Sequence, residues 1–147
     1  RLMRRYVYDM KPTEFTRWLR LRDDGKKVTL TYKHIKDEHK IEGTEEIEVE
    51  FNDFEKTNII LKELGYVPKA YQENRRIHYE IGEVCIEIDF WPKIPPYLEI
   101  EGKSKAAVEE MVKRLGLDLS QTTSINTDTV YKKYGLDIYS FKELKFD

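Results

Sequence analysis

Much of the chain alternates hydrophobic and polar residues with a period of two, which is typical of β-strands with one apolar and one polar face. In the segment 18–22, Leu19 and Leu21 share one face, whereas Trp18, Arg20 and Arg22 share the other. The same alternation predicts further strands at 5–9, 28–33, 46–51, 76–81, 84–90 and 97–101. The Asp23-Asp24-Gly25 run and Gly82 predict hairpin turns, because glycine readily adopts a positive φ.

Three segments have the capping residues and apolar spacing of helices. Asn52 and Asp53 are both suitable N-caps for the first, and Asn52 with Glu55 has the spacing of a capping box. The expected helices run from Asn52 or Asp53 to about Leu64, from Ser104 to Gly116, and from Asp128 to Tyr134. The succession of strands and helices predicts an α+β fold, with an antiparallel sheet and helices on its apolar face.

Composition narrows the class of protein. The 147 residues suit one domain, and 39% hydrophobic content with only 7 Gly and 5 Pro argues against disorder. The 26 basic and 28 acidic residues nearly cancel, which argues against a nucleic-acid or membrane-surface partner. The single cysteine, Cys85, excludes an internal disulfide and fits a reducing compartment, so we expect a cytoplasmic protein.

The polar faces of the predicted strands collect an unusual density of charge. Like charges at i and i+2 lie about 7 Å apart and repel, unless a ligand of opposite charge lies beside them. Cations on strands suit phosphate oxygens, and carboxylate pairs suit Mg²⁺ or Mn²⁺. The alternative is a solvated sheet whose surface ion pairs contribute about 0–1 kcal/mol each, but the acids outnumber the bases that could pair with them. The set comprises Arg20, Arg22, Lys33, Arg76, Glu46, Glu48, Glu50, Glu87, Asp89, Glu99 and Glu101.

The remaining candidates for chemistry are weaker. His34, His39 and His78 are scattered, with no Cys or His at the usual ligand spacing, so a zinc site is not expected. His78 is expected to be a structural residue or a contact at the rim of a substrate site. Cys85 is expected to be a buried thiol without a histidine partner. The chain contains no glycine-rich phosphate loop, so any phosphate is expected to be bound by side chains on strands.

The predicted strands with their charged residues, taken in order along the chain, resemble the CYTH superfamily. This superfamily includes class IV adenylate cyclases, thiamine triphosphatases and inorganic triphosphatases. The resemblance implies a closed antiparallel β-barrel, the triphosphate tunnel, with helices packed on the outside. The family's N-terminal Glu-x-Glu-x-Lys strand is absent before Tyr6, so we expect residues 1–147 to be a single domain lacking its N-terminal strand and helix. The matching stretches are Tyr6–Asp9, Arg17–Arg22, Thr29–Lys33, Glu46–Val49, Arg75-Arg76, Cys85–Asp89 and Tyr97–Glu101.

The resemblance also implies roles for individual residues. Arg20, Arg22, Lys33 and Arg76 would bind the triphosphate, with Arg75 as the alternative to Arg76 if the strand register differs by one. Glu99 and Glu101 would bind Mg²⁺ or Mn²⁺, with Asp89 as a further ligand or a base that orients water. Arg76 and Lys33 would act with Asp89 in catalysis, and Glu48 and Glu87 would hold the basic residues in place.

Three activities are compatible with these roles. The preferred one is metal-dependent hydrolysis of a triphosphate, with tripolyphosphate, ATP or thiamine triphosphate as substrate. The second is a class IV adenylate cyclase that converts ATP to cyclic AMP and pyrophosphate, and the third is a non-catalytic module that binds polyphosphate or nucleotide. A homodimer is left open, and no nucleic-acid or membrane partner is expected.

Overall fold

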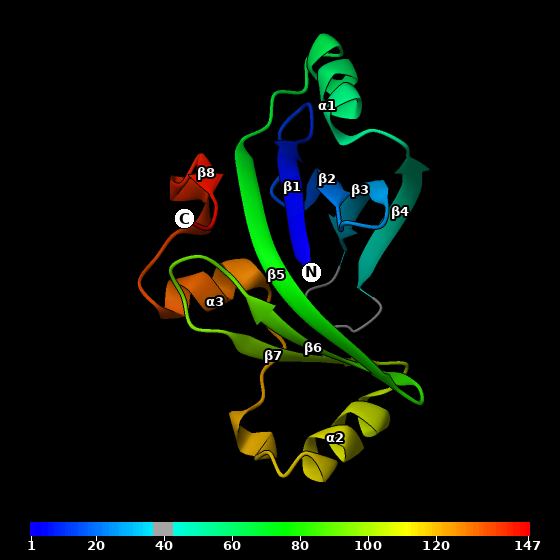
Figure 1. Cartoon of the computed structure of the whole chain (residues 1–147), viewed down its shortest axis with the longest axis vertical. Coiled ribbons are helices and arrows are strands. Elements are labelled where there is room, and N and C mark those ends of the chain that lie inside the picture. The colour runs from blue at the N-terminus through cyan, green and yellow to red at the C-terminus, as the bar shows by residue number, and fades with distance from the viewer. Residues whose placement is uncertain (37–42) are drawn as a thin grey trace. The chain divides into compact units, whose positions relative to one another are not determined.

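The computed structural model describes residues 1–36 and 43–147, which form two compact units. Unit 1 comprises Arg1–Glu73 with Tyr139–Asp147, and unit 2 comprises Asn74–Ile138. The strands are β1 (Leu2–Asp9), β2 (Arg17–Asp23), β3 (Val28–Ile35), β4 (Thr44–Phe51), β5 (Ala70–Ile81), β6 (Val84–Phe90), β7 (Tyr97–Gly102) and β8 (Glu143–Leu144). The α-helices are α1 (Phe54–Glu63), α2 (Lys105–Arg114) and α3 (Thr127–Lys133), and short 3-10 helices lie at Leu119–Gln121 and Ile138–Ser140 (Figure 1).

The strands follow the order β4-β3-β2-β1-β5-β6-β7, and β5 runs from unit 1 into unit 2. The pairs β1–β2, β2–β3, β3–β4, β5–β6 and β6–β7 are antiparallel, as the alternating pattern predicted. The two-residue β8 pairs in parallel with β5, a pairing that so short a segment could not indicate. The order ends at β4 and β7 in the described part of the chain, and closure into a barrel stays a prediction.

In unit 1, helix α1 covers the apolar face of β1 and β2. Tyr8, Leu21, Phe54 and Leu61 form its buried core. The Tyr8 hydroxyl donates to Asn58 Oδ1 at 3.0 Å, so this helix is also held by a buried polar contact. Burial of these four side chains explains why the Leu19 and Leu21 face turns away from solvent.

The N-terminus of α1 differs in detail from the prediction. Asp53 is the N-cap, and its side chain accepts from the backbone N–H of Lys56 at 2.9 Å. The capping box expected from Asn52 to Glu55 is therefore wrong, because the helix begins one residue later. Glu55 instead accepts from Arg4 Nη1 at 3.2 Å.

In unit 2, helix α2 packs on β6 and β7. Val84, Ile86 and Met111 form the buried cluster, and the predicted Ser104 caps the helix through the Ala107 N–H. Helix α3 begins at Thr127, one residue before the prediction. No helix among residues 1–36 and 43–147 is both long and apolar enough to cross a membrane.

Candidate functional site

The basic residues of unit 1 gather on one face of β1, β2 and β3. The register places Arg22 opposite Arg5 on β1 and opposite Thr29 on β3. Directly opposed residues project to the same side of a sheet, and positions two apart on a strand share a face. Arg5, Arg20, Arg22 and Lys33 therefore lie on the same face, and all four are only partly exposed.

Arg5 was missed by sequence reasoning. It follows Arg4 directly, so a charged residue stands on each face of the strand and alternation could not decide which one faces inward. The strand register decides it, because Arg5 pairs with Arg22 whereas Arg4 contacts Asp23 and Glu55 beside α1. A pairing prediction for β1 and β2 is the signal that could have found it.

The surroundings of Lys33 disfavour its positive charge. Burial lowers the pKa of its amine, and the positive charges of Arg20 and Arg22 lower it further, while Glu46 opposes both. Its Nζ lies 2.5 Å from Glu46 Oε1, and its side chain is 19% exposed. An enclosed ammonium group beside two guanidinium groups is an environment that favours a multiply charged anion.

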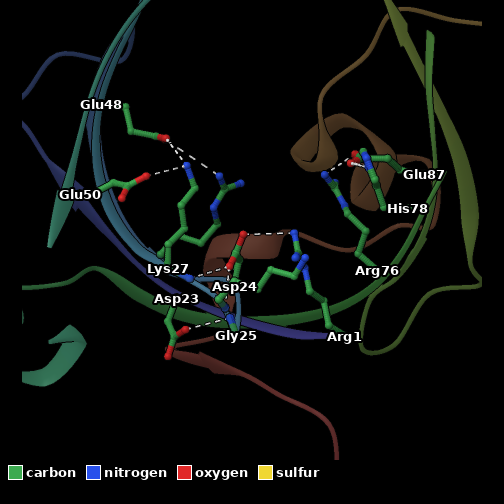
Figure 2. Close-up of polar contacts among 12 residues, drawn as sticks. Arg1, Asp23, Asp24, Gly25, Lys27, Glu48, Glu50, Arg76, His78 and Glu87 are labelled. Atoms are coloured by element: carbon green, nitrogen blue, oxygen red, sulfur yellow. Dashed lines mark hydrogen bonds and ion pairs between the residues drawn. The ribbon is translucent and has the colours of Figure 1, made fainter. Parts of the chain in front are cut away.

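Glu48 contacts the basic residues from β4. Its carboxylate accepts from Thr31 Oγ1 at 2.8 Å and lies 4.0 Å from Arg22 Nη2. Figure 2 shows Lys27 with its amine between Glu48 and Glu50, at 3.6 and 3.2 Å. Glu48 thus contacts Thr31 and two cations, Arg22 and Lys27.

In unit 2 the acidic residues share the face of β5, β6 and β7 that carries Arg76. Three rows of opposed residues cross the three strands, and within each row all side chains point to the same side. Arg75 instead pairs with Phe90 and lies exposed on the opposite face, so Arg76 and not Arg75 shares a face with the acidic residues. The rows are Arg76, Asp89 and Tyr97; His78, Glu87 and Glu99; and Glu80, Cys85 and Glu101.

Arg76 is held by three carboxylates. Its Nε donates to Asp89 Oδ1 at 2.6 Å, and its Nη2 donates to Asp89 Oδ2 at 2.5 Å and to Glu99 Oε2 at 3.0 Å. Its Nη1 forms an ion pair with Glu87, and Asp89 is only 1% exposed. A guanidinium engaged in this way orients the acidic side chains around it.

The carboxyl of Glu99 on β7 has a raised pKa. Burial raises the pKa of its carboxyl to about 7, and the charges of Asp89, Glu101 and Glu87 add to the rise, although Arg76 opposes it. Glu101 lies two residues further along β7 and is exposed on the same face. Two carboxylates on one face of a strand are the type of ligand that a hard divalent cation such as Mg²⁺ or Mn²⁺ prefers.

A comparison with family models identifies the class of protein. The model of the CYTH domain matches residues 8–130 of the chain. The chain belongs to the CYTH domain family. The comparison with curated proteins gives no match.

Solved structures share the fold of this CYTH domain. A protein from Pyrococcus horikoshii is 24% identical with a TM-score of 0.69, and the alignment covers 83% of this chain and 77% of that one. A conserved hypothetical protein from Pyrococcus furiosus is 26% identical with a TM-score of 0.67, covering 86% and 82%. A protein from Vibrio parahaemolyticus, named "putative adenylate cyclase", is 15% identical with a TM-score of 0.64, covering 89% and 80%.

Within the CYTH domain, each unit brings together part of the predicted set. Unit 1 joins Arg20, Arg22 and Lys33 on one face, and unit 2 joins Arg76 with its acidic neighbours. Of the histidines, His34 lies 3.7 Å from Glu45 on β4, and His39 falls outside the described residues.

Proposed function

We propose that this CYTH domain hydrolyses a triphosphate with the help of Mg²⁺ or Mn²⁺. The observation that carries the proposal is the concentration of Arg5, Arg20, Arg22 and Lys33 on one face of unit 1. Cationic side chains gathered on one face of a sheet suit the several negatively charged oxygens of a triphosphate. Inorganic tripolyphosphate and organic triphosphates share this recognition chemistry.

In this proposal, the metal ion binds at the acidic face of unit 2. Glu99 and Glu101 would hold it through carboxylate oxygens, the donors that Mg²⁺ and Mn²⁺ prefer. When bound, such an ion supplies Lewis-acid polarisation of a phosphoryl oxygen. The pKa of Glu99, raised by burial and further by the neighbouring carboxylates, supports this role, because a bound cation would offset both effects.

The contacts change the proposed roles of Arg76 and Asp89. Sequence reasoning expected Arg76 to grip phosphate and Asp89 to bind metal or orient water. Asp89 is buried and bonded to two guanidinium nitrogens, so we assign both to positioning Glu99 and Glu87. Lys33 and the arginines of unit 1 would stabilise the charge that develops on the phosphoryl oxygens during hydrolysis.

The second candidate is a class IV adenylate cyclase. The similarity to the Vibrio parahaemolyticus protein supports it, because that protein is named "putative adenylate cyclase" and shares the fold. The same cations would bind the triphosphate of ATP. The ribose 3′-hydroxyl would attack the α-phosphate, so that pyrophosphate leaves and the phosphodiester of cyclic AMP forms.

The deciding experiment identifies the product. The purified chain is incubated with tripolyphosphate and, separately, with ATP, each with Mg²⁺ and with Mn²⁺. Orthophosphate released from tripolyphosphate supports the triphosphatase, whereas cyclic AMP with pyrophosphate from ATP supports the cyclase. Neither product, with triphosphate still raising the melting temperature, would overturn both activities and leave a binding module.

A pair of variants tests the phosphate site itself. Arg20→Ala and Arg22→Ala should each abolish the rise in melting temperature that tripolyphosphate causes, while the unliganded protein remains folded. Lys62→Ala removes an exposed charge from the last turn of α1 and serves as the control. Unfolding of both arginine variants without ligand would show that these residues are structural and would contradict the assignment.

A further inference from the structure

The hairpin of β5 and β6 assembles a group of side chains that the proposed activity does not use. His78 and Glu80 stand two residues apart on β5, and Cys85 lies directly opposite Glu80 on β6. One ligand atom from each of the three lies within 4.8 Å of the other two. Sequence reasoning found no partner for Cys85, because the partners are joined by the turn at Gly82 and not by a short spacing along the chain.

His78 is already oriented as a metal ligand would be. Its Nδ1 lies 2.9 Å from Glu87 Oε1, and Glu87 is only 8% exposed and paired with Arg76. Figure 2 shows Arg76, Glu87 and His78 side by side. Metal-binding histidines almost always donate one ring N–H to a carboxylate, which leaves the other nitrogen for the metal.

The second ring nitrogen of His78 lies beside Glu80. Its Nε2 lies 3.2 Å from Glu80 Oε1. Two ligand atoms of one tetrahedral Zn²⁺ are separated by about 3.3–3.6 Å, given Zn–N and Zn–S bonds of about 2.0–2.3 Å. The imidazole and the carboxylate therefore have the separation of two ligands, and the Cys85 sulfur, within 4.8 Å of both residues, is the third donor.

The donor types distinguish this group from the carboxylates of β7. Thiolate and imidazole ligands favour Zn²⁺ and similar transition metals, whereas carboxylates alone favour Mg²⁺ and Mn²⁺. Three protein ligands leave a fourth position for water. The half-buried thiol of Cys85 would lose its proton on binding.

The geometry points to a second metal site, formed by His78, Glu80 and Cys85, that takes a thiophilic divalent transition metal of the Zn²⁺ type. Glu87 acts as the positioning residue, since it fixes the imidazole without itself contacting the metal. The site does not depend on the proposed triphosphatase activity, and none of its three ligands belongs to the proposed Mg²⁺ site.

Cobalt binding tests this site without any turnover. The full chain, stripped of metal with EDTA and dialysed, is titrated with Co²⁺ under reducing conditions and followed by visible and near-ultraviolet absorption. We expect one equivalent to bind with a thiolate-to-cobalt charge-transfer band, and Zn²⁺ to displace it. Cys85→Ser should remove the band, and His78→Gln should weaken Co²⁺ binding by at least about tenfold.

The control is Glu83→Gln, which removes an exposed carboxylate from the same hairpin and should leave Co²⁺ binding unchanged. Absence of the thiolate band, or its persistence in Cys85→Ser, would overturn the proposal. Displacement of Co²⁺ by Mg²⁺ as readily as by Zn²⁺ would also overturn it, because the ion would then lie among carboxylates alone.

Alkylation of Cys85 in the unmodified chain gives a second readout that needs no variant to fold. Zn²⁺ should slow the reaction of the thiol with iodoacetamide by at least about tenfold, and Mg²⁺ should not. An equal rate with and without Zn²⁺ contradicts the site. Both measurements can succeed whether or not the protein cleaves triphosphate, so a failure here is distinguishable from a failure of the proposed function.

Discussion

Replacing Glu99 by Gln should make the stability of this protein less dependent on pH. In the folded protein, burial raises the pKa of Glu99 from its ordinary value of 4.5 to about 7. Between these two pH values the folded state keeps a proton that the unfolded state has lost. Stability from this group is therefore fully present below about pH 4.5 and is lost as the pH rises through about 7.

The structure sets the size of the effect. A displacement of the pKa from 4.5 to about 7 corresponds to about 3.4 kcal/mol at 1.36 kcal/mol per pH unit. The Glu99 side chain is 36% exposed, so solvent screening reduces this figure. We expect Glu99→Gln to gain about 1 kcal/mol in free energy of unfolding, relative to the parent protein, between about pH 5 and about pH 8.

Urea denaturation at the two pH values, with EDTA present, measures the gain directly. Glutamine keeps an oxygen that can accept from Arg76, so the variant preserves the contact now made at 3.0 Å. Glu101→Gln is the matched control on the same strand. Its carboxylate is exposed to solvent, and the variant should not reproduce the gain.

A difference between Glu99→Gln and the parent that is equal at the two pH values would refute this reasoning. It would show that Glu99 ionises in the folded protein as it does in the unfolded chain. Burial and the neighbouring carboxylates would then be too weak to support a cation site at Glu99.

Three further substitutions test other parts of the structure. Arg5→Ala should abolish the rise in melting temperature caused by tripolyphosphate, whereas Arg4→Ala, on the opposite face of β1, should keep it. Equal losses in the two variants would contradict the placement of Arg5 on the basic face. Asp89→Ala should destabilise the fold by about 3–5 kcal/mol in urea denaturation, because it removes a buried carboxylate that accepts two hydrogen bonds from the partly buried Arg76 guanidinium. A cost below about 1 kcal/mol would show that the pair is not structural. Leu21→Ala should cost about 2–5 kcal/mol, since the side chain is fully buried under α1, while Leu117→Ala, which is 45% exposed, should cost far less in the same assay.

Most of the secondary structure could be predicted from local pattern. The period-two alternation of segments such as 18–22 and 46–51 gave strands that the structure confirms within one to two residues. Helix α2 begins after the predicted Ser104 cap, because a capping side chain satisfies backbone N–H groups that the helix itself leaves open. Local pattern did not decide the α1 cap, because adjacent Asn52 and Asp53 can both perform that task.

Longer-range pairings decided the remainder of the fold. Strand β5 begins at Ala70, six residues before the alternating segment that predicted it, and its first residues pair with β8. Those residues lie in a stretch without clear alternation. Their backbone hydrogen bonds are satisfied by a segment more than seventy residues away, which no local pattern contains.

The candidate sites likewise depend partly on local sequence pattern and partly on strand pairing. Alternation alone placed Arg20 with Arg22 and Glu99 with Glu101, since residues two apart on a strand share a face whatever the strand pairs with. Pairing register, which depends on the packing of whole strands, decided that Arg76 and not Arg75 meets Asp89, and that Arg5 joins the basic face. Composition and alternation thus determined which charges each strand presents, and the tertiary structure determined which charges meet, because cross-strand neighbours are set by burial of the apolar faces beneath them.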